Sequence, residues 1–505
     1  MKPSAKPASR SLTLSTSSAT FLGHPRGLAT LFFTEMWERF TYYGMRAVLV
    51  LFLVAAVSSG GLGIDDKTAT AIYGLYTAGV YLAALPGGWI ADRLIGARRA
   101  VLIGGIGITL GNALLAASST PRGFYLGLVV IVLGVGLLKP NVSAMVADLY
   151  PEGGARLDAG FTLFYMGINL GATIGPFVVA EAQEWIGPRA GFGAAAVFMA
   201  VGVVQYVLTQ HYLGSAGTFT SGPTTGQRRH WAQMWIAVGV GVLALAAVTF
   251  GWIAVNPLGL AHATTGVIFA TAVLFFGYLF FGANLSAEEK RRALVIVVLF
   301  LGSALFWSGY EQAGSSLNLF AERYTDRTLD MFHFVIPAGW FQALNPAFVI
   351  AFAPAVAWVW LLLARRGMNV SAPAKFAIGV ILMGSGFLVM AAAASVVAGG
   401  SKALPYWLIA TYFLHTIGEL CLSPVGLSYV TKLSPKRFVG QMMGMWFLSL
   451  SLGNLAAGLI AGEFDSNNVA AMPGQYLHIV YFAVGLGAVL LALSRPVKKL
   501  MGDVQ

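Results

Sequence analysis

Charged residues are scarce in this sequence. Only 10% of its 505 residues are Asp, Glu, Lys or Arg, whereas 57% are hydrophobic; an ordinary soluble domain carries about 25% charged residues. Apolar runs of about 20 residues recur along almost the whole chain, and each could cross roughly 30 Å of hydrocarbon as a helix. These runs do not alternate polar and apolar residues in segments of about 10, which excludes a β-barrel. The composition therefore predicts an all-α membrane protein.

Cysteine is almost absent as well. Cys421 is the only one, so no disulfide can form within the chain, and no Cys/His cluster has the spacing of a metal site. The sequence also lacks an HExxH motif and any Ser/His arrangement typical of a hydrolase. We therefore expect no metal, no cofactor and no enzymatic activity.

The net charge of +11 does not form one basic patch, because the Lys and Arg residues are spread over many loops. We therefore expect no nucleic-acid partner. Most of these residues fall in every second loop, and the positive-inside rule then places both termini in the cytoplasm. Residues 1–27 are rich in Ser, Pro and Lys, which predicts a disordered cytoplasmic tail and not a signal peptide.

Hydrophobic runs predict fourteen transmembrane helices. Their expected ranges are 28–57, 67–95, 99–120, 123–149, 157–182, 190–214, 231–256, 261–285, 291–322, 333–364, 374–398, 403–432, 437–462 and 474–495. We divide the chain into a tail at 1–27, a six-helix bundle at 28–214, a linker and accessory hairpin at 215–289, a second six-helix bundle at 290–497 and a tail at 498–505. Two such bundles are typical of transporters that rock around a site near the membrane midplane.

The first predicted helix carries an unusual charge cluster. Glu35, Glu38, Arg39, Tyr42 and Arg46 recur at helical spacing and share one face. Charges at membrane depth are tolerated only where they pair internally or line a water-filled cavity, so this face cannot meet lipid. The cluster indicates a transport pathway, with an internally neutral pair that only holds helices together as the alternative.

Three further charges fall within predicted helices. Lys139 lies well before the end of its helix, which argues against snorkelling to the interface, whereas Glu311 and Glu419 lie in the second bundle. The buried cations thus all lie in the first half, and the unpaired buried carboxylates lie in the second. A zwitterion would fit between them.

Longer motifs carry a specific resemblance. ExxERFxYYG begins at Glu35, FYxxIN at Phe164, WFQxLNP at Trp340 and GELxxSPxGLS at Glu419. Together they resemble the proton-dependent oligopeptide transporter (POT) family of the major facilitator superfamily, and the match spans both halves. The loop GGWIADRLIGARR from Gly87 is similar to a motif of the wider superfamily, and the accessory hairpin resembles that of fourteen-helix bacterial members.

The resemblance implies a proton-coupled symporter that imports di- and tripeptides by alternating access, with protons as the coupling ion. Peptide-like drugs are further candidate ligands, and we expect a monomer in a bacterial inner membrane. The implied proton-coupling residues are Glu35, Glu38, Arg39, Glu311 and Glu419. The implied substrate-binding residues are Arg46, Tyr42, Tyr43, Tyr81, Lys139, Tyr165, Asn169, Trp307, Asn345, Glu419, Ser423 and Trp446. The implied cytoplasmic latch consists of Asp92, Arg93, Arg98 and Arg99.

For gating we expect two salt bridges between the halves, Arg46 with Glu311 and Lys139 with Glu419, each broken when its carboxylate is protonated. His415 shares a face with Glu419, but a satisfied core histidine is the simpler interpretation. Helix packing is likewise an alternative for Trp446.

Three other functions stay open from the residues alone. A proton/drug antiporter of the same superfamily is disfavoured by the opposite charges at the two ends of the site. An integral membrane enzyme lacks a catalytic motif. A channel would not accumulate peptide against its own concentration difference.

Overall fold

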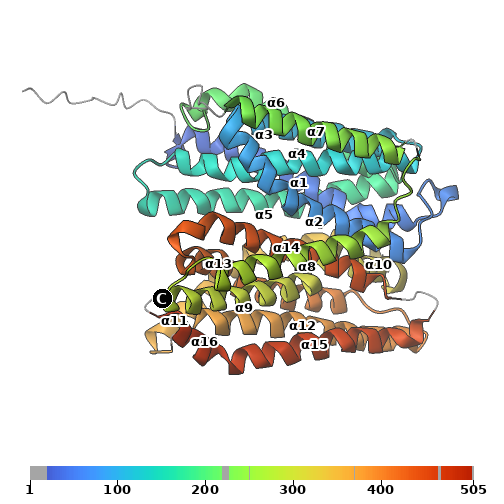
Figure 1. Ribbon diagram of the computed structural model, residues 1–505. Helices are drawn as coiled ribbons and strands as arrows, with labels where there is room; N and C mark the ends of the chain where they lie inside the picture. The colour runs from blue at the N-terminus through green and yellow to red at the C-terminus, as the bar shows by residue number, and fades with distance from the viewer. Residues whose placement is uncertain (1–19, 219–226, 250, 369, 465–467, 503–505) are drawn as a thin grey trace, which may run out of the picture.

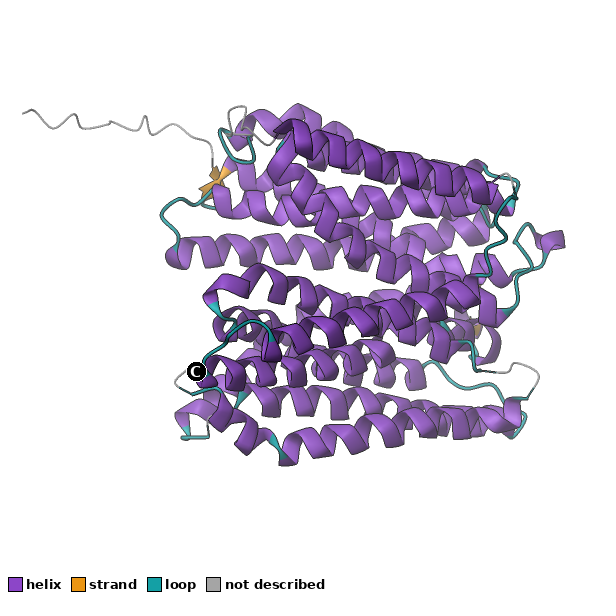
Figure 2. Ribbon diagram, viewed as in Figure 1, coloured by secondary structure: helices purple, strands orange, loops and turns teal. Residues whose placement is uncertain are grey.

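Long helices make up almost all of the protein in a computed structural model, which describes residues 20–218, 227–249, 251–368, 370–464 and 468–502 (Figures 1 and 2). The first half contains α1 (Arg26–Val54), α2 (Asp66–Ile90), α3 (Ala97–Ala117), α4 (Pro121–Asp148), α5 (Gly154–Trp185) and α6 (Ala190–Thr209). Two accessory helices follow, α7 (Gln227–Thr249) and α8 (Pro257–Phe281). The second half contains α9 (Ala287–Tyr310), α10 (Ser316–Tyr324), α11 (Leu344–Arg365), α12 (Ala372–Ala398), α13 (Tyr406–Leu433), α14 (Val439–Ala461), α15 (Met472–Ala492) and α16 (Ser494–Leu500).

Short elements connect these helices. The strands are β1 (Thr20–Phe21), β2 (His24–Pro25), β3 (Thr328–Leu329) and β4 (Phe334–Val335), which form two antiparallel pairs. The 3₁₀ turns are η1 (Val57–Ser59), η3 (Gln210–Leu213), η4 (Glu311–Gly314), η5 (Asp330–Phe332), η6 (Ala338–Ala343), η7 (Lys436–Phe438) and η8 (Val469–Ala471), and η2 (Ala91–Ile95) is a π-helical turn.

The predicted fold class is confirmed. Among the described residues, thirteen helical segments are long and apolar enough to cross a membrane. α1 is also long enough, with 29 residues, but after its first residue, the exposed Arg26, it contains four charged side chains. All four are buried inside the protein, as expected for a helix that cannot show this face to lipid.

The two halves form two layers, with α1–α6 above and α9–α15 below in Figure 1. Each half has its own hydrophobic core. The cores interlock, because Leu319 of α10 packs into the core of the first half, whereas Ala71 and Ala78 of α2 pack into that of the second. α2 and α10 are therefore two of the elements through which the halves contact each other.

The accessory hairpin bridges the halves. α8 packs against α2 of the first half and α14 of the second. At the start of α7, the ring of His230 meets that of Trp89 edge-on, with 5.6 Å between centroids. At the end of α8, the Arg437 guanidinium donates to the carbonyl oxygens of Ala283 and Asn284, at 2.6 and 3.1 Å. A cation at this position stabilises the C-terminal end of α8.

The chain ends differ from the predicted tails. Residues 1–19 lie outside the described residues, but residues 20–25 form a hairpin, and His24 Nδ1 lies 2.8 Å from the hydroxyl of Tyr150. α1 already begins at Arg26, so the predicted disorder is wrong for 20–27. At the other end, α16 continues to Leu500, past the predicted start of the tail at 498. Both described ends lie on the left of Figure 1, the end of the molecule at which α3 begins; we call it the Arg98 end.

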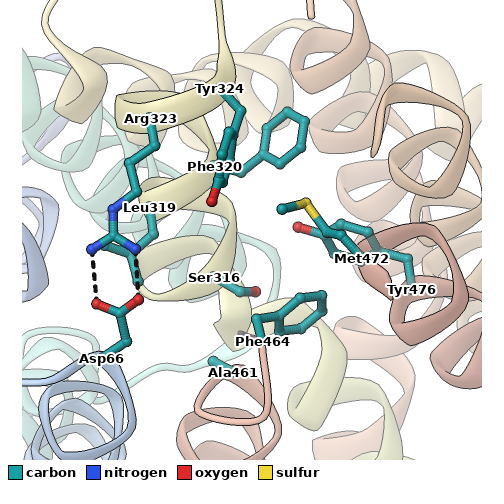
Figure 3. A pocket seen from close by; sticks show the side chains of 10 residues that line it. All are labelled: Asp66, Ser316, Leu319, Phe320, Arg323, Tyr324, Ala461, Phe464, Met472 and Tyr476. Atoms are coloured by element: carbon teal, nitrogen blue, oxygen red, sulfur yellow. Dashed lines mark hydrogen bonds and ion pairs between the residues drawn. The ribbon is translucent and has the colours of Figure 1, made fainter. Parts of the chain in front are cut away.

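At the opposite end, where α2 begins, polar contacts join the halves; we call it the Asp66 end. The Arg323 guanidinium of α10 binds the Asp66 carboxylate in a two-pronged ion pair, with N–O distances of 2.5 and 2.8 Å (Figure 3). Lys67 Nζ lies 2.9 Å from Glu463 Oε1, and Asn318 Nδ2 donates to the backbone oxygen of Ala47 at 2.7 Å. These contacts close the Asp66 end.

α2 and α14 also approach closely near this end. A Cβ atom at Gly74 would lie 3.2 Å from the Cα of Gly458, so a larger residue at either position would push the helices apart. Among the described residues, the ion pairs between the halves lie here or near the middle of the helices. The ion pairs at the Arg98 end stay within one half.

We expect loss of the Asp66–Arg323 pair to open the Asp66 end. Ser316 lines the cavity beside this pair (Figure 3) and is 5% exposed. In a Cys421→Ser background, Ser316→Cys should react with a membrane-impermeant thiol reagent up to about fivefold faster when Arg323→Ala is added, since such pairs contribute up to about 1 kcal/mol.

The control is Arg327→Ala, which breaks the 2.9 Å pair with Glu322 inside the second half and should leave the rate unchanged. Equal rates in all three proteins would show that the Asp66–Arg323 pair does not hold this end closed.

Candidate functional site

The charge cluster of α1 forms a compact triad. Arg39 Nε lies 3.0 Å from Glu35 Oε1 and 2.6 Å from Glu38 Oε2, and all three residues are at most 5% exposed. Helical spacing brings Glu35 and Arg39 together one turn apart, and Glu38 reaches the same guanidinium from the adjacent position. Two carboxylates thus share one cation.

Arg46, two turns further along α1, connects the halves. Its Nη1 lies 3.1 Å from Glu311 Oε2, and the two side chains are 3% and 4% exposed. The guanidinium also lies near the rings of Tyr43 and Tyr73, at 5.6 and 5.9 Å from their centroids. Arg46 and Glu311 are the residues of the first predicted gating salt bridge. They are in contact in the structure, and both charges are buried.

Glu311 takes its position from a break in a helix. The sequence predicts one helix over 291–322, but α9 ends at Tyr310 and α10 begins at Ser316, with the turn η4 between them. The break frees the carbonyl oxygen of Ala313, which accepts hydrogen bonds from Gln342 Nε2 and, at 3.3 Å, from the hydroxyl of Tyr412. These two hydrogen bonds hold η4 in the position from which Glu311 contacts α1.

Glu419 has a different environment. Its Oε2 accepts hydrogen bonds from the Tyr310 hydroxyl at 2.8 Å and from Asn345 Nδ2 at 3.0 Å. No Lys or Arg forms an ion pair with it in the described part of the chain. Glu419 is partly buried, and a carboxylate withdrawn from water without a cation tends to take up a proton or to bind a cation from outside the protein.

The predicted salt bridge between Lys139 and Glu419 is not among the ion pairs of the described residues. Lys139 Nζ lies instead over the ring of Tyr81, 4.3 Å from its centroid, and interacts electrostatically with Glu38 and Glu35. Lys139 therefore faces the triad of its own half, while hydrogen bonds occupy Glu419 in the other half.

Seven ionisable side chains line the middle of the bundle. The carboxylates are Glu35, Glu38, Glu311 and Glu419, and the cations are Arg39, Arg46 and Lys139. With every group ionised, the set has one negative charge in excess. Since an uncompensated charge is strongly disfavoured at membrane depth, the set can take up one proton or one bound cation.

Aromatic residues predicted for the pocket surround these charges in the first half. The Tyr42 ring meets those of Tyr43 and Tyr76, at 5.3 and 6.2 Å between centroids, and lies under Arg39. Tyr165 is 46% exposed on α5, and the Asn169 side chain of the next turn donates to its backbone oxygen at 3.0 Å.

The predicted pocket residues of the second half divide into two groups. Trp307 Nε1 and Ser423 Oγ are buried polar atoms without a hydrogen-bond partner among the described residues, so both retain a free donor. Trp446 is 7% exposed and packs on Gly426 of α13 and on Phe376 of α12. These contacts match the packing alternative for Trp446.

The predicted latch is not formed. Asp92, Arg93 and Arg99 are exposed at the Arg98 end, and no ion pair of theirs occurs in the described ranges. Arg98 donates to the carbonyl oxygens of Gly214 and Ala216, which lie after α6 in the same half. A latch needs a nearby partner in the other half, and the ion pairs that join the halves among the described residues lie near the middle of the helices or at the Asp66 end.

Sequence reasoning missed several residues of the site. Tyr310 binds Glu419, Thr416 binds Asn345, and Gln342 binds the η4 break. Tyr73 lies beside Arg46. Tyr310 is directly next to Glu311, which is a signal that could have drawn attention to it. His415 lies in the core, with Nε2 3.1 Å from the Met383 carbonyl oxygen, in agreement with the simpler interpretation.

Comparison with known proteins decides the family. The sequence pattern of the POT family matches residues 98–477. The chain belongs to the POT family. It is 41% identical to the peptide transporter YePEPT of Yersinia enterocolitica, over 96% of this chain and 97% of that protein. It is 34% identical to a di-/tripeptide transporter of Lactococcus lactis subsp. cremoris, over 97% and 99%.

A solved structure of a POT family protein has the same fold. It is a mutant of peptide transporter POT in complex with alafosfalin, with a TM-score of 0.88 and 38% identity, and the match covers 96% of this chain and 98% of that one. The family resemblance seen in the motifs is therefore confirmed. The chain is a multi-pass membrane protein of this family. The relatives are named as transporters and not as enzymes, as the sequence predicts for this chain.

We expect the Arg46–Glu311 pair to be mutually dependent. Arg46→Met should lower the free energy of unfolding by about 3 kcal/mol, because it leaves a buried carboxylate uncompensated. The double variant with Glu311→Gln should recover most of that loss. Thermal unfolding of the purified protein in detergent measures both effects.

The matched control is Arg156→Met, which removes an exposed pair with Glu152 at 3.6 Å and should change stability little. A double variant no more stable than Arg46→Met would contradict mutual compensation.

Proposed function

We propose that this protein is a proton-coupled symporter that imports di- and tripeptides by alternating access across a bacterial inner membrane. The observation that carries the proposal is Glu419, a partly buried carboxylate without a cation, in a site whose ionised groups have one negative charge in excess. The names of its relatives as peptide transporters support the substrate class.

In this proposal the Arg98 end is cytoplasmic, because Lys and Arg gather in its loops. Contacts at the Asp66 end then hold the external side closed, and the peptide would leave the site toward the cytoplasm. The site belongs to a single chain, which supports transport by a monomer.

A zwitterionic peptide matches the two sides of the site. Its ammonium group would bind Glu419, and its carboxylate would bind Arg46 or Lys139. Arg46 and Lys139 already face carboxylates of the protein. The carboxylate of the peptide would therefore separate one of these cations from its carboxylate partner. A buried carboxylate that loses its cation binds a proton, which links peptide binding to proton binding without any cofactor.

The same exchange of ion-pair partners would let the two halves move relative to each other. The Arg46–Glu311 pair attaches α1 to η4, and protonation of Glu311 removes the attraction between them. Glu35 and Glu38 share Arg39 next to Lys139, so a proton on either carboxylate would free a cation for the peptide. Polar groups of Tyr42, Tyr43, Tyr81, Tyr165, Asn169, Trp307, Asn345 and Ser423 would complete the pocket, since amides and hydroxyls can bond any peptide backbone.

Uptake by proteoliposomes with an acidic exterior tests the proposal. The unaltered protein should accumulate labelled dialanine against its gradient. Glu35→Gln should lose this accumulation more than tenfold, because a neutral side chain cannot take up the proton and the lost interaction is worth several kcal/mol. It should keep peptide exchange without a gradient.

Arg46→Ala should lower both accumulation and exchange, whereas Arg156→Ala, at an exposed pair, should lower neither. Unlabelled tripeptides should compete with dialanine, and single amino acids, nitrate and hydrophobic drugs should not. Competition by drugs alone would favour an antiporter, and accumulation unaffected by Glu35→Gln would overturn its role in coupling.

A further inference from the structure

The Glu419 carboxylate is held by one of its two oxygens. Both the Tyr310 hydroxyl and Asn345 Nδ2 donate to Oε2. Within the described ranges no donor reaches Oε1, and the residue is only partly buried. The carboxylate is thus fixed on one side and free on the other.

Asn345 is fixed in turn by Thr416. The Thr416 hydroxyl donates to the backbone oxygen of Tyr412 at 2.7 Å, so its proton is committed and the oxygen can act as an acceptor. Asn345 Nδ2 donates to that oxygen at 3.0 Å. The opposite amide orientation would place two oxygens against Thr416 and Glu419, so Thr416 determines that Asn345 presents a donor to Glu419.

Tyr310 is fixed by aromatic packing. It is the last residue of α9 and is 6% exposed. Its ring stacks on Phe306 with 5.5 Å between centroids and meets Trp307 edge-on at 5.0 Å. These contacts leave the ring little freedom, so the hydroxyl stays at the position from which it reaches Glu419.

We propose that Tyr310 and Thr416 are positioning residues that make the site specific for peptides with a free amino terminus. They hold Oε2 so that Oε1 remains free as a single, oriented acceptor for an ammonium group. This inference rests on the proposed function, in which Glu419 binds the amino terminus. It adds that recognition of the amino group depends on side chains that do not themselves contact the peptide.

The carboxylate has no cation to orient it, so its hydrogen bonds do so alone. Phenylalanine at 310 would keep the ring packing and remove one of the two donors. The carboxylate could then rotate, and Oε1 would spend less time in the direction of the ammonium group. Binding of a ligand that lacks this group would not change.

Competition for dialanine uptake separates orientation from packing. Inhibition constants are measured for dialanine and for N-propionylalanine, which has the same shape without the ammonium group. Their ratio in the unaltered protein gives the preference for the amino group. In Tyr310→Phe this preference should fall about tenfold, the effect of losing one hydrogen bond to a charged group.

The constant for N-propionylalanine should stay the same in Tyr310→Phe. Thr416→Val should reduce the preference in the same direction, and Thr416→Ser, which keeps the hydroxyl, should retain it. The matched control is Tyr476→Phe, at a tyrosine of α15 that is 1% exposed and lines the same cavity as the Asp66–Arg323 pair, on its other side (Figure 3); it should leave both constants unchanged.

Three results would overturn the inference, and they are distinguishable. Equal weakening of both ligands by Tyr310→Phe would indicate a packing role. An unchanged preference in both Tyr310→Phe and Thr416→Val would show that these two residues do not orient Glu419. If the unaltered protein itself shows no preference for the amino group, the proposed role of Glu419 fails, and the inference fails with it.

Discussion

The ion pair between Arg46 and Glu311 is the contact on which the rest of the structure depends. It joins α1 to the break between α9 and α10, and its side chains are 3% and 4% exposed. Neither charge can be left alone at this depth, so the halves stay together there while both are ionised. The contacts of α10 with the first half, up to Arg323 and Asp66, extend from the same break. We therefore expect a change of charge at Glu311 to act on the whole closed end.

Much of this arrangement follows from sequence patterns. Long apolar runs determine the helices, because a helix satisfies its own backbone groups in lipid. The spacing of Glu35, Glu38 and Arg39 indicates one face, and the structure brings these three side chains together. The motifs identify the family because they are specific and the match spans both halves. These signals are local in the chain, which is why they can be read without a structure.

The remaining features depend on residues far apart in the sequence. Tyr310 and Glu419 are separated by 109 positions, and no spacing relates them. Charge alone led to the predicted pairing of Lys139 with Glu419. In the structure, Lys139 faces Tyr81 and the triad, whereas Glu419 binds Tyr310 and Asn345. The latch at Asp92 fails for another reason, since salt bridges between halves depend on which end is closed. Charge complementarity gives possible partners, and the fold selects among them.

The central claim is that the excess negative charge of the site links peptide movement to proton movement. Proteoliposomes with equal pH on both sides, a trapped pH dye and a dialanine gradient test it directly. The account predicts that dialanine entering the vesicles acidifies their interior, and that the acidification disappears without the gradient. Dialanine entry at the same rate with no change in internal pH would contradict it.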